Sequence, residues 1–178
     1  GAITFNGAVT LTGSSTMTGD TQFASTLTGG SNALTVSGNL NLDGAATGLT
    51  STSVSGTSNL GASVTTSSTQ TYSGAVTLSA HTVLTTTNSD ISFSTIDSDS
   101  TDRNLSLATG SGNISVTGAI GSSNNINVLT VNNTGTFTTS SSVDTTTMTL
   151  THTGGTTIGG TLTATTVNLT DTTDATDI

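Results

Sequence analysis

The chain has 178 residues, of which 30% are hydrophobic, 6% charged and 3% aromatic, and it contains no Pro, Cys or Trp. All ten acidic residues are aspartate and the single basic residue is Arg103, so the formal net charge is −9. One arginine cannot form the basic surface that nucleic-acid binding requires. The absence of cysteine excludes disulfide frameworks and Cys-ligated zinc. Thr, Ser, Gly and Asn, all poor helix formers, fill more than half of the positions, which argues against a helical protein.

Short bursts of alternating apolar and polar residues predict β-strands along the whole chain. In chain order they occupy residues 8–12, 33–36, 40–42, 75–78, 91–93, 105–107, 114–116, 126–128, 149–151, 161–163 and 167–169. Clusters of Gly, Ser and Asn separate them, for example at 29–32 and 109–113, and predict turns. No apolar stretch approaches the roughly 20 residues of a membrane helix, so no membrane insertion is expected.

The spacing of the bursts and the small side chains between them favour one all-β architecture. The bursts lie too close together for β-α-β units, and a sandwich core needs bulkier filling than four Phe and Tyr72 provide. Val, Ile, Leu and Ala on very short strands suit a narrow parallel coil instead. We therefore predict a parallel β-solenoid of roughly nine coils of about 20 residues each. Residues 1–178 would form a single domain that ends in a polar, acidic tail over 171–178.

Internal similarity supports a repetitive fold. Residues 49–67 read much like residues 129–146, and the segment GAVTL occurs at both 7–11 and 74–78. These matches predict a longer repeat of about 75–80 residues that contains several coils.

Several segments resemble the repeat region of filamentous-haemagglutinin-like bacterial exoproteins. They are QTYSGAVTL at 70–78, TVLT at 82–85, ISFSTID at 91–97 and LSLATGSGNISVTGAIG at 105–121. The resemblance implies a right-handed parallel β-helix, an adhesin function and an extracellular location at the bacterial cell surface. The secretion domain of such proteins carries Asn-Pro motifs, and this chain has no Pro, so an internal shaft segment or a relative with a different export route is expected.

A second resemblance concerns the first 30 residues. GAVTLTG at 7–13 and TMTG at 16–19 are similar to the shafts of phage tail fibres. Such shafts are intertwined trimers, which leaves a trimeric β-structure as an alternative.

The most charged stretch contains Asp97, Asp99 and Asp102, whose oxygen atoms alternate along the chain as in calcium loops. Calcium is therefore the one cofactor that the sequence suggests, although the Gly and the distal Glu of an EF-hand are missing. The alternative is a solvated turn with Asp102 near Arg103. The tail residues Asp171, Asp174 and Asp177 have the same two interpretations.

Nothing in the sequence predicts an enzyme. His81 and His152 are far apart in the chain and have no Cys or Glu beside them, and no Gly-x-Ser-x-Gly motif is present. Solenoid glycosidases and lyases also use aromatic and basic residues, of which this chain has very few.

Thr-x-Thr pairs recur, for example at Thr16/Thr18 and Thr147/Thr149. A flat array of such pairs matches an ice lattice, so an ice-binding β-solenoid is a further alternative. The plainer account is a strand with Thr pointing outward and an apolar residue pointing inward.

Together these features predict a structural extracellular protein, the shaft or subunit of a bacterial surface fibre or adhesin. A solenoid end exposes unpaired backbone groups, so we expect end-to-end stacking with further copies or continuation into a longer chain. A glycan or protein on a host or other surface is a candidate partner, through loops such as residues 97–104.

Overall fold

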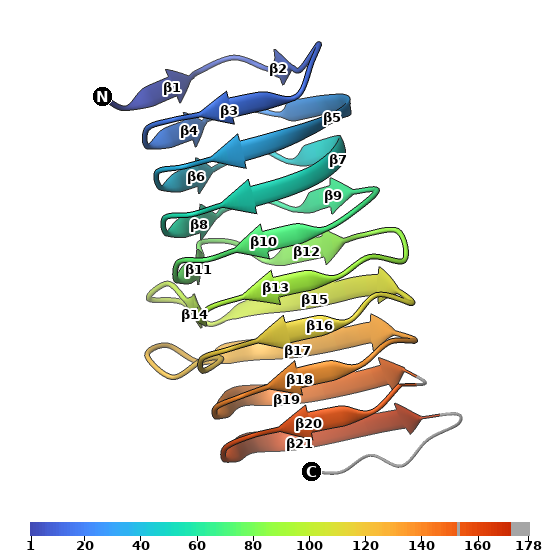
Figure 1. Ribbon diagram of the computed structural model, residues 1–178. Helices are drawn as coiled ribbons and strands as arrows, with labels where there is room; N and C mark the ends of the chain where they lie inside the picture. The colour runs from blue at the N-terminus through green and yellow to red at the C-terminus, as the bar shows by residue number, and fades with distance from the viewer. Residues whose placement is uncertain (153, 172–178) are drawn as a thin grey trace.

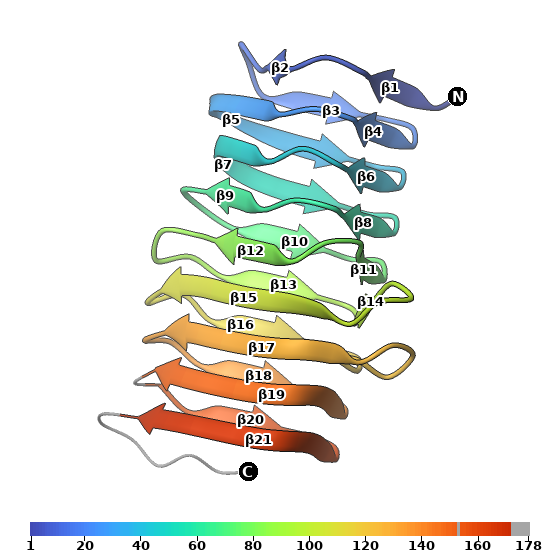
Figure 2. The same ribbon diagram turned by 180° about the vertical axis from the view of Figure 1, so that it is seen from behind.

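The computed structural model describes residues 1–152 and 154–171, and these contain β-strands and no helix. The chain descends from the N-terminus in a right-handed coil: strands at the front run to the left, and those behind them run to the right (Figure 1). Figure 2 shows the same coils from behind. All strand pairs are parallel and join one coil to the next, which gives about nine coils. The predicted parallel β-solenoid is confirmed.

Each coil presents up to three faces, and the first is a six-stranded sheet on the left of Figure 1. We call it face 1. Its strands are β1 (Ile3–Phe5), β4 (Thr21–Phe23), β6 (Leu40–Leu42), β8 (Ser58–Leu60), β11 (Val76–Leu78) and β14 (Ile96–Ser98).

The remaining strands form one continuous sheet that covers the other two faces. Face 2, at the back of Figure 1, contains β2 (Val9–Thr10), β9 (Val64–Thr66), β12 (Thr82–Thr85), β15 (Arg103–Gly110), β17 (Ile126–Asn133), β19 (Val143–His152) and β21 (Leu162–Asp171). Face 3, at the front, contains β3 (Ser15–Met17), β10 (Gln70–Tyr72), β13 (Ile91–Phe93), β16 (Ile114–Val116), β18 (Phe137–Thr139) and β20 (Thr156–Ile158). Two strands, β5 (Leu27–Val36) and β7 (Ala46–Val54), bend from face 2 into face 3. β19 and β21 begin on face 1, where Val143 and Leu162 continue the column of Ile96 and Ile120, and then run along face 2.

Some strands are longer than the bursts that predicted them. β5 continues without a break through residues 29–32, which the sequence predicts as a turn. Gly30 and Ser31 have positive φ angles of 58° and 62°, so they turn the strand around the corner while β5 stays paired with β7 on both sides of it. At the other end, β21 extends to Asp171. The rest of the predicted acidic tail, including Asp174 and Asp177, lies outside the described residues.

The register stacks one inward side chain per coil into continuous columns. One column on face 2 runs through all the coils and contains Val9, Leu27, Ala46, Val64, Leu84, Leu107, Val131, Leu150 and Leu169. Aromatic rings stack in the same way, with centroids 5.1 Å apart in Phe5–Phe23 and 5.3 Å apart in Tyr72–Phe93. Successive coils lie about one strand spacing, roughly 4.8 Å, apart. The interior is therefore narrow, and almost every inward side chain contacts its equivalents above and below.

Side chains at the corners tie successive coils together. The Oδ1 of Asp20 accepts a hydrogen bond from the backbone N–H of Asn39 at 2.8 Å, and the Oδ1 of Asn39 accepts one from the backbone N–H of Thr57 at 2.8 Å. The same Asp–Asn–Thr series recurs at another corner, in Asp90, Asn113 and Thr136, with distances of 2.7 and 2.9 Å. In each bond the N-terminal coil provides the side-chain acceptor and the next coil provides the backbone donor. The corners, where chain direction changes, thus keep their backbone groups paired.

The coils differ in length although their columns stay aligned. Ile3 pairs with Thr21, 18 positions further on, whereas Ile96 pairs with Ile120, 24 positions further on. Val143 and Leu162, near the C-terminal end, are again only 19 positions apart. The additional residues lie at the corners and not in the columns.

One buried polar cluster interrupts the apolar interior. Gln70 is fully buried, and its Nε2 donates to the carbonyl oxygens of Thr85 at 2.9 Å and Val64 at 3.2 Å. The Oη of Tyr72 donates to the Oε1 of Gln70 at 3.1 Å. Both polar ends of the Gln70 amide are therefore satisfied inside the core, as burial demands.

This cluster predicts a loss of stability at alkaline pH. Burial raises the pKa of the Tyr72 phenol above its ordinary value of 10.0. The stability that the buried, neutral Tyr72 contributes is complete below about pH 10 and declines above it. At higher pH the Tyr72 phenol ionises more readily in the unfolded chain than in the folded chain. We expect urea unfolding to show a falling free energy of unfolding from pH 9 to pH 11, and the variant Tyr72→Phe to lose this dependence. Equal pH dependence in both proteins would contradict the assignment.

Candidate functional site

The aspartates that the sequence suggested for calcium make other contacts. Arg103 donates to both carboxylate oxygens of Asp99, with Nε to Oδ1 at 2.9 Å and Nη2 to Oδ2 at 2.7 Å. These bonds and the backbone N–H of Thr101 hold the pKa of Asp99 below its ordinary value. The ion pair thus involves Asp99 and not Asp102, which is exposed. Asp97 accepts from the backbone N–H of Ser123 at 2.8 Å in the next coil.

The part of the chain that the structure describes contains no group of three or more His, Asp or Glu side chains that could hold a metal ion. Calcium binding by Asp97, Asp99 and Asp102 therefore remains a prediction from the sequence. The two histidines lie in different coils: His81 precedes β12 and accepts from the backbone N–H of Asn104 at 2.9 Å, whereas position 152 ends β19. Within residues 1–152 and 154–171, no helix is long and apolar enough to cross a membrane.

The two longest coils form a protruding corner next to face 1. The loop that follows β14 and the loop of the next coil, residues 121–125, both protrude on the left of Figure 1, and the backbone N–H of Ser123 donates to Asp97 Oδ1 in β14. Ser98 Oγ donates to the carbonyl oxygen of Asn125 at 2.7 Å, and Asn125 Nδ2 donates to Thr146 Oγ1 at 2.9 Å. The protrusion is thus ordered by contacts between coils.

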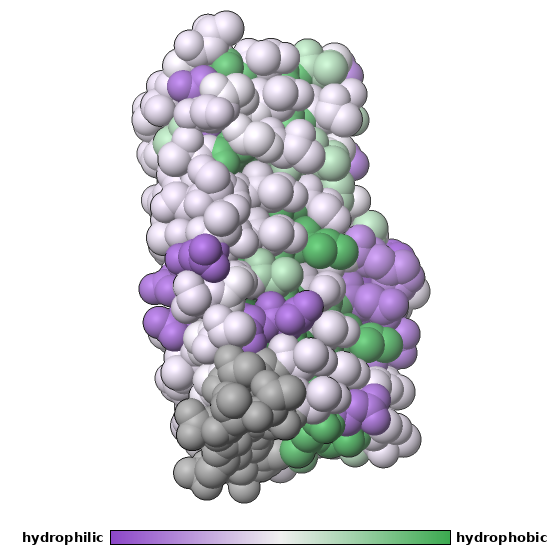
Figure 3. Space-filling model, turned by 90° about the vertical axis from the view of Figure 1, so that its right-hand side faces the viewer, coloured by the Kyte–Doolittle hydropathy of each residue, from purple (hydrophilic) through white to green (hydrophobic). Residues whose placement is uncertain are grey.

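Face 3 carries a regular column of hydroxyl groups. Its outward positions, one per coil and in direct register, are Thr16, Thr35, Ser53, Thr71, Ser92, Ser115, Thr138 and Thr157. A second column of hydroxyl groups lies directly after each strand, at Ser37, Ser55, Ser73, Ser94, Thr117 and Ser140. The predicted arrangement, with Thr pointing outward and an apolar residue pointing inward, is confirmed on this face at Thr16 and Thr35. In Figure 3, the adjoining side of the molecule is mostly of intermediate hydropathy, with scattered hydrophilic and hydrophobic patches.

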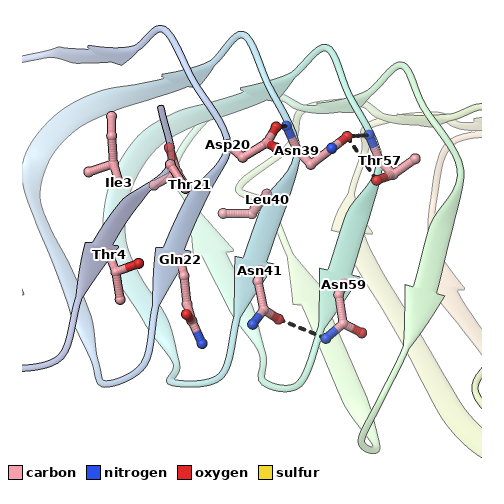
Figure 4. A pocket seen from close by; sticks show the side chains of 11 residues that line it. Ile3, Thr4, Asp20, Thr21, Gln22, Asn39, Leu40, Asn41, Thr57 and Asn59 are labelled. Atoms are coloured by element: carbon pink, nitrogen blue, oxygen red, sulfur yellow. Dashed lines mark hydrogen bonds between the residues drawn. The ribbon is translucent and has the colours of Figure 1, made fainter.

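A shallow groove of about 290 Å³ crosses face 1 near the N-terminal end. Two rows of polar side chains border it, as Figure 4 shows: Asp20, Asn39 and Thr57 form one row, and Thr4, Gln22, Asn41 and Asn59 form the other. Ile3, Thr21 and Leu40 lie between the rows. The groove arises because equivalent positions of successive coils stack, so that each row is a column of the solenoid.

Hydrogen bonds within each row fix the side chains. Asn59 Nδ2 donates to Asn41 Oδ1 at 2.7 Å, and Gln22 Nε2 donates to Asp43 Oδ2 at 2.9 Å. The bonds to Asp20 and Asn39 described above hold the other row. Sequence reasoning missed this groove, although the segments Leu40-Asn41-Leu42 and Ser58-Asn59-Leu60, 18 positions apart, were a signal for it.

The first and last described coils expose members of the core columns. In the first coil, Phe5, Val9 and Met17 are only partly buried, although they pack against the core. In the last, Val167 and Leu169 are 40% and 47% exposed. Strand β1 pairs only with β4, and β21 only with β19, so one edge of each is open within the described residues.

Comparison of the chain with protein families, with curated proteins and with solved structures gave no match.

Proposed function

We propose that the chain is a structural rod, the shaft or a subunit of an extracellular bacterial fibre or adhesin. The observation that supports this most strongly is the column on face 2, which continues from Val9 to Leu169 with one aliphatic residue in every coil. In a solenoid each coil contacts only its neighbours, so rigidity along the axis depends on an unbroken series of such contacts.

The surface is consistent with a rod that avoids unspecific contacts. A net charge of −9 and a surface rich in hydroxyl groups disfavour binding to DNA and to anionic lipid. The resemblance of residues 70–78 and 105–121 to filamentous-haemagglutinin-like repeats supports the adhesin assignment and the extracellular location.

The open coils at both ends support end-to-end joining. An unpaired strand edge above a partly exposed apolar column is a template for a further parallel strand. Another coil of a longer chain or the first coil of a second copy would pair these edges and cover Val167 and Leu169. The phage-shaft alternative requires strand pairs between three chains, whereas the described strands pair within one chain.

Electron microscopy and sedimentation of the purified chain test this proposal. We expect rods whose length increases with protein concentration in steps of about 40 Å, the height of nine coils. Leu169→Asp should shorten the rods, because it places a charge in the open apolar column. The matched control Thr170→Asp changes a neighbouring outward position and should not. A compact, monodisperse monomer at all concentrations would contradict end-to-end stacking.

A second candidate, ice binding, is favoured by one specific observation: the hydroxyl column of face 3 repeats at the strand spacing over eight successive coils. The test is thermal hysteresis, with Thr71→Tyr expected to abolish it and the matched variant Thr77→Tyr, on face 1, to preserve it. Absence of hysteresis in the unmodified chain would reject this candidate.

A further inference from the structure

We propose that the groove on face 1 binds an uncharged, hydroxyl-rich ligand, namely a short stretch of a neutral oligosaccharide. This site does not depend on the proposed rod function, since it lies on the side of coils 1 to 4 and not at an end. Its volume of about 290 Å³ is at the lower limit of small-molecule sites, which suits a few sugar rings.

The groove offers polar atoms that the protein itself leaves unused. Asn39 is bonded through its Oδ1, which leaves its Nδ2 without a partner among the described residues. Asn59 donates through its Nδ2, so its Oδ1 is available to accept from a ligand. Gln22 donates through its Nε2, so its Oε1 is available in the same way. Donors and acceptors therefore face the groove from both rows, in orientations that the bonds between coils fix in advance. Sugar hydroxyls, which both donate and accept, match such a mixed set.

Apolar surface in the groove lies at its N-terminal end. Ala2 is exposed and Ile3 is half-buried, whereas Leu40 is only 3% exposed and packs in the core. A sugar ring has polar edges and apolar C–H surfaces, so a ring fits against Ala2 and Ile3 while hydroxyls reach the polar rows. Displacing water from this apolar end would add to affinity.

The charges in the groove exclude other ligand classes. Asp20 is the only charged side chain that lines the groove. Asp43 does not line the groove but accepts a hydrogen bond from Gln22, which does. No Lys or Arg is present to bind phosphate, sulfate or uronic acid groups, so an anionic ligand would be repelled. An extended peptide is also disfavoured, because peptides that add to sheets need an open edge, and here the backbone groups are already paired between coils.

Isothermal titration of the full chain tests this proposal, with cellotetraose, xylotetraose and chitotetraose as neutral probes and a hyaluronan tetrasaccharide as the acidic probe. We expect saturable binding of at least one neutral probe, and weaker or no binding of the acidic one. Asn59→Leu removes the free Oδ1 acceptor of the groove, together with the donor of the bond to Asn41, and should weaken binding by about tenfold or more.

The matched control is Asn127→Leu. Asn127 Nδ2 donates to Asn104 Oδ1 at 2.9 Å in an equivalent bond between coils, outside the groove. This variant should lose similar stability and bind the probe as the unmodified chain does. Equal binding by both variants, tighter binding of the acidic probe, or no saturable binding of any neutral probe at millimolar concentration would overturn the proposal. None of these results bears on whether the chain forms rods, which microscopy decides separately.

Discussion

Replacing Phe137 with alanine is expected to lower the free energy of unfolding by about 3–5 kcal/mol, as measured by urea denaturation. Phe137 is fully buried and is among the largest side chains of the core. It lies in register between Ile114 and Thr156, one in each adjacent coil. The loss combines the transfer free energy of the ring with a cavity that coils held at one strand spacing cannot close.

The damage should remain local, because each coil contacts only its neighbours. Hydrogen exchange should show loss of protection in β16, β18 and β20, while β4, β6 and β8 keep theirs. Thr138→Ala, at the adjacent outward position, is the matched control and should change stability by no more than about 0.5 kcal/mol. A uniform loss of protection along the whole chain would show that the solenoid unfolds as one unit instead.

The variant Gln70→Leu should also be strongly destabilising, by about 2–4 kcal/mol, although leucine is apolar and similar in size. The substitution leaves the Tyr72 hydroxyl without its acceptor and the carbonyl oxygen of Thr85 without its donor, and buried unpaired polar groups are costly. Leu34 and Ile91 occupy the same inward column of face 3, so an apolar residue is compatible with the position itself.

A double-mutant cycle separates the cost of the unpaired Tyr72 hydroxyl from the cost of the unpaired Thr85 carbonyl oxygen. Tyr72→Phe removes the hydroxyl that Gln70→Leu leaves unpaired, so the double variant should be more stable than Gln70→Leu alone. Urea denaturation of all four proteins gives the coupling free energy. A double variant that is less stable than Gln70→Leu would show that the hydroxyl is not the group left unsatisfied.

The strands could be predicted from local alternation because each one buries every second residue. The predicted segments 40–42, 91–93 and 114–116 coincide with β6, β13 and β16. The coil number also followed from the sequence, since it depends on total length and on a coil of about 20 residues.

The predicted long repeat was wrong for a physical reason. Val9 and Val76 occupy the same place in two copies of GAVTL, yet Val9 lies on face 2 and Val76 on face 1. Leu49 pairs with Thr66, whereas its supposed equivalent, Leu129, pairs with Met148 in another column. All three faces use the same alternation and the same few residue types, so local similarity does not identify the face.

Sequence reasoning missed the groove on face 1 for a related reason. Its rows combine residues from four coils, and the separation between coils varies from 18 to 24 positions. Only the register shows that Gln22, Asn41 and Asn59 are neighbours. A polar side chain in a Thr- and Asn-rich chain has no local signal that separates a ligand contact from a solvated surface.

The variable coil lengths make the corners of this fold permissive to inserted sequence. Coils that differ by five residues still align Ile96 with Ile120 and Val143 with Leu162. A foreign peptide grafted after β14 would therefore be displayed to the side, while the aliphatic columns keep their spacing. The same freedom lets the corners change in sequence and length while the stacked columns that stabilise the solenoid stay unchanged.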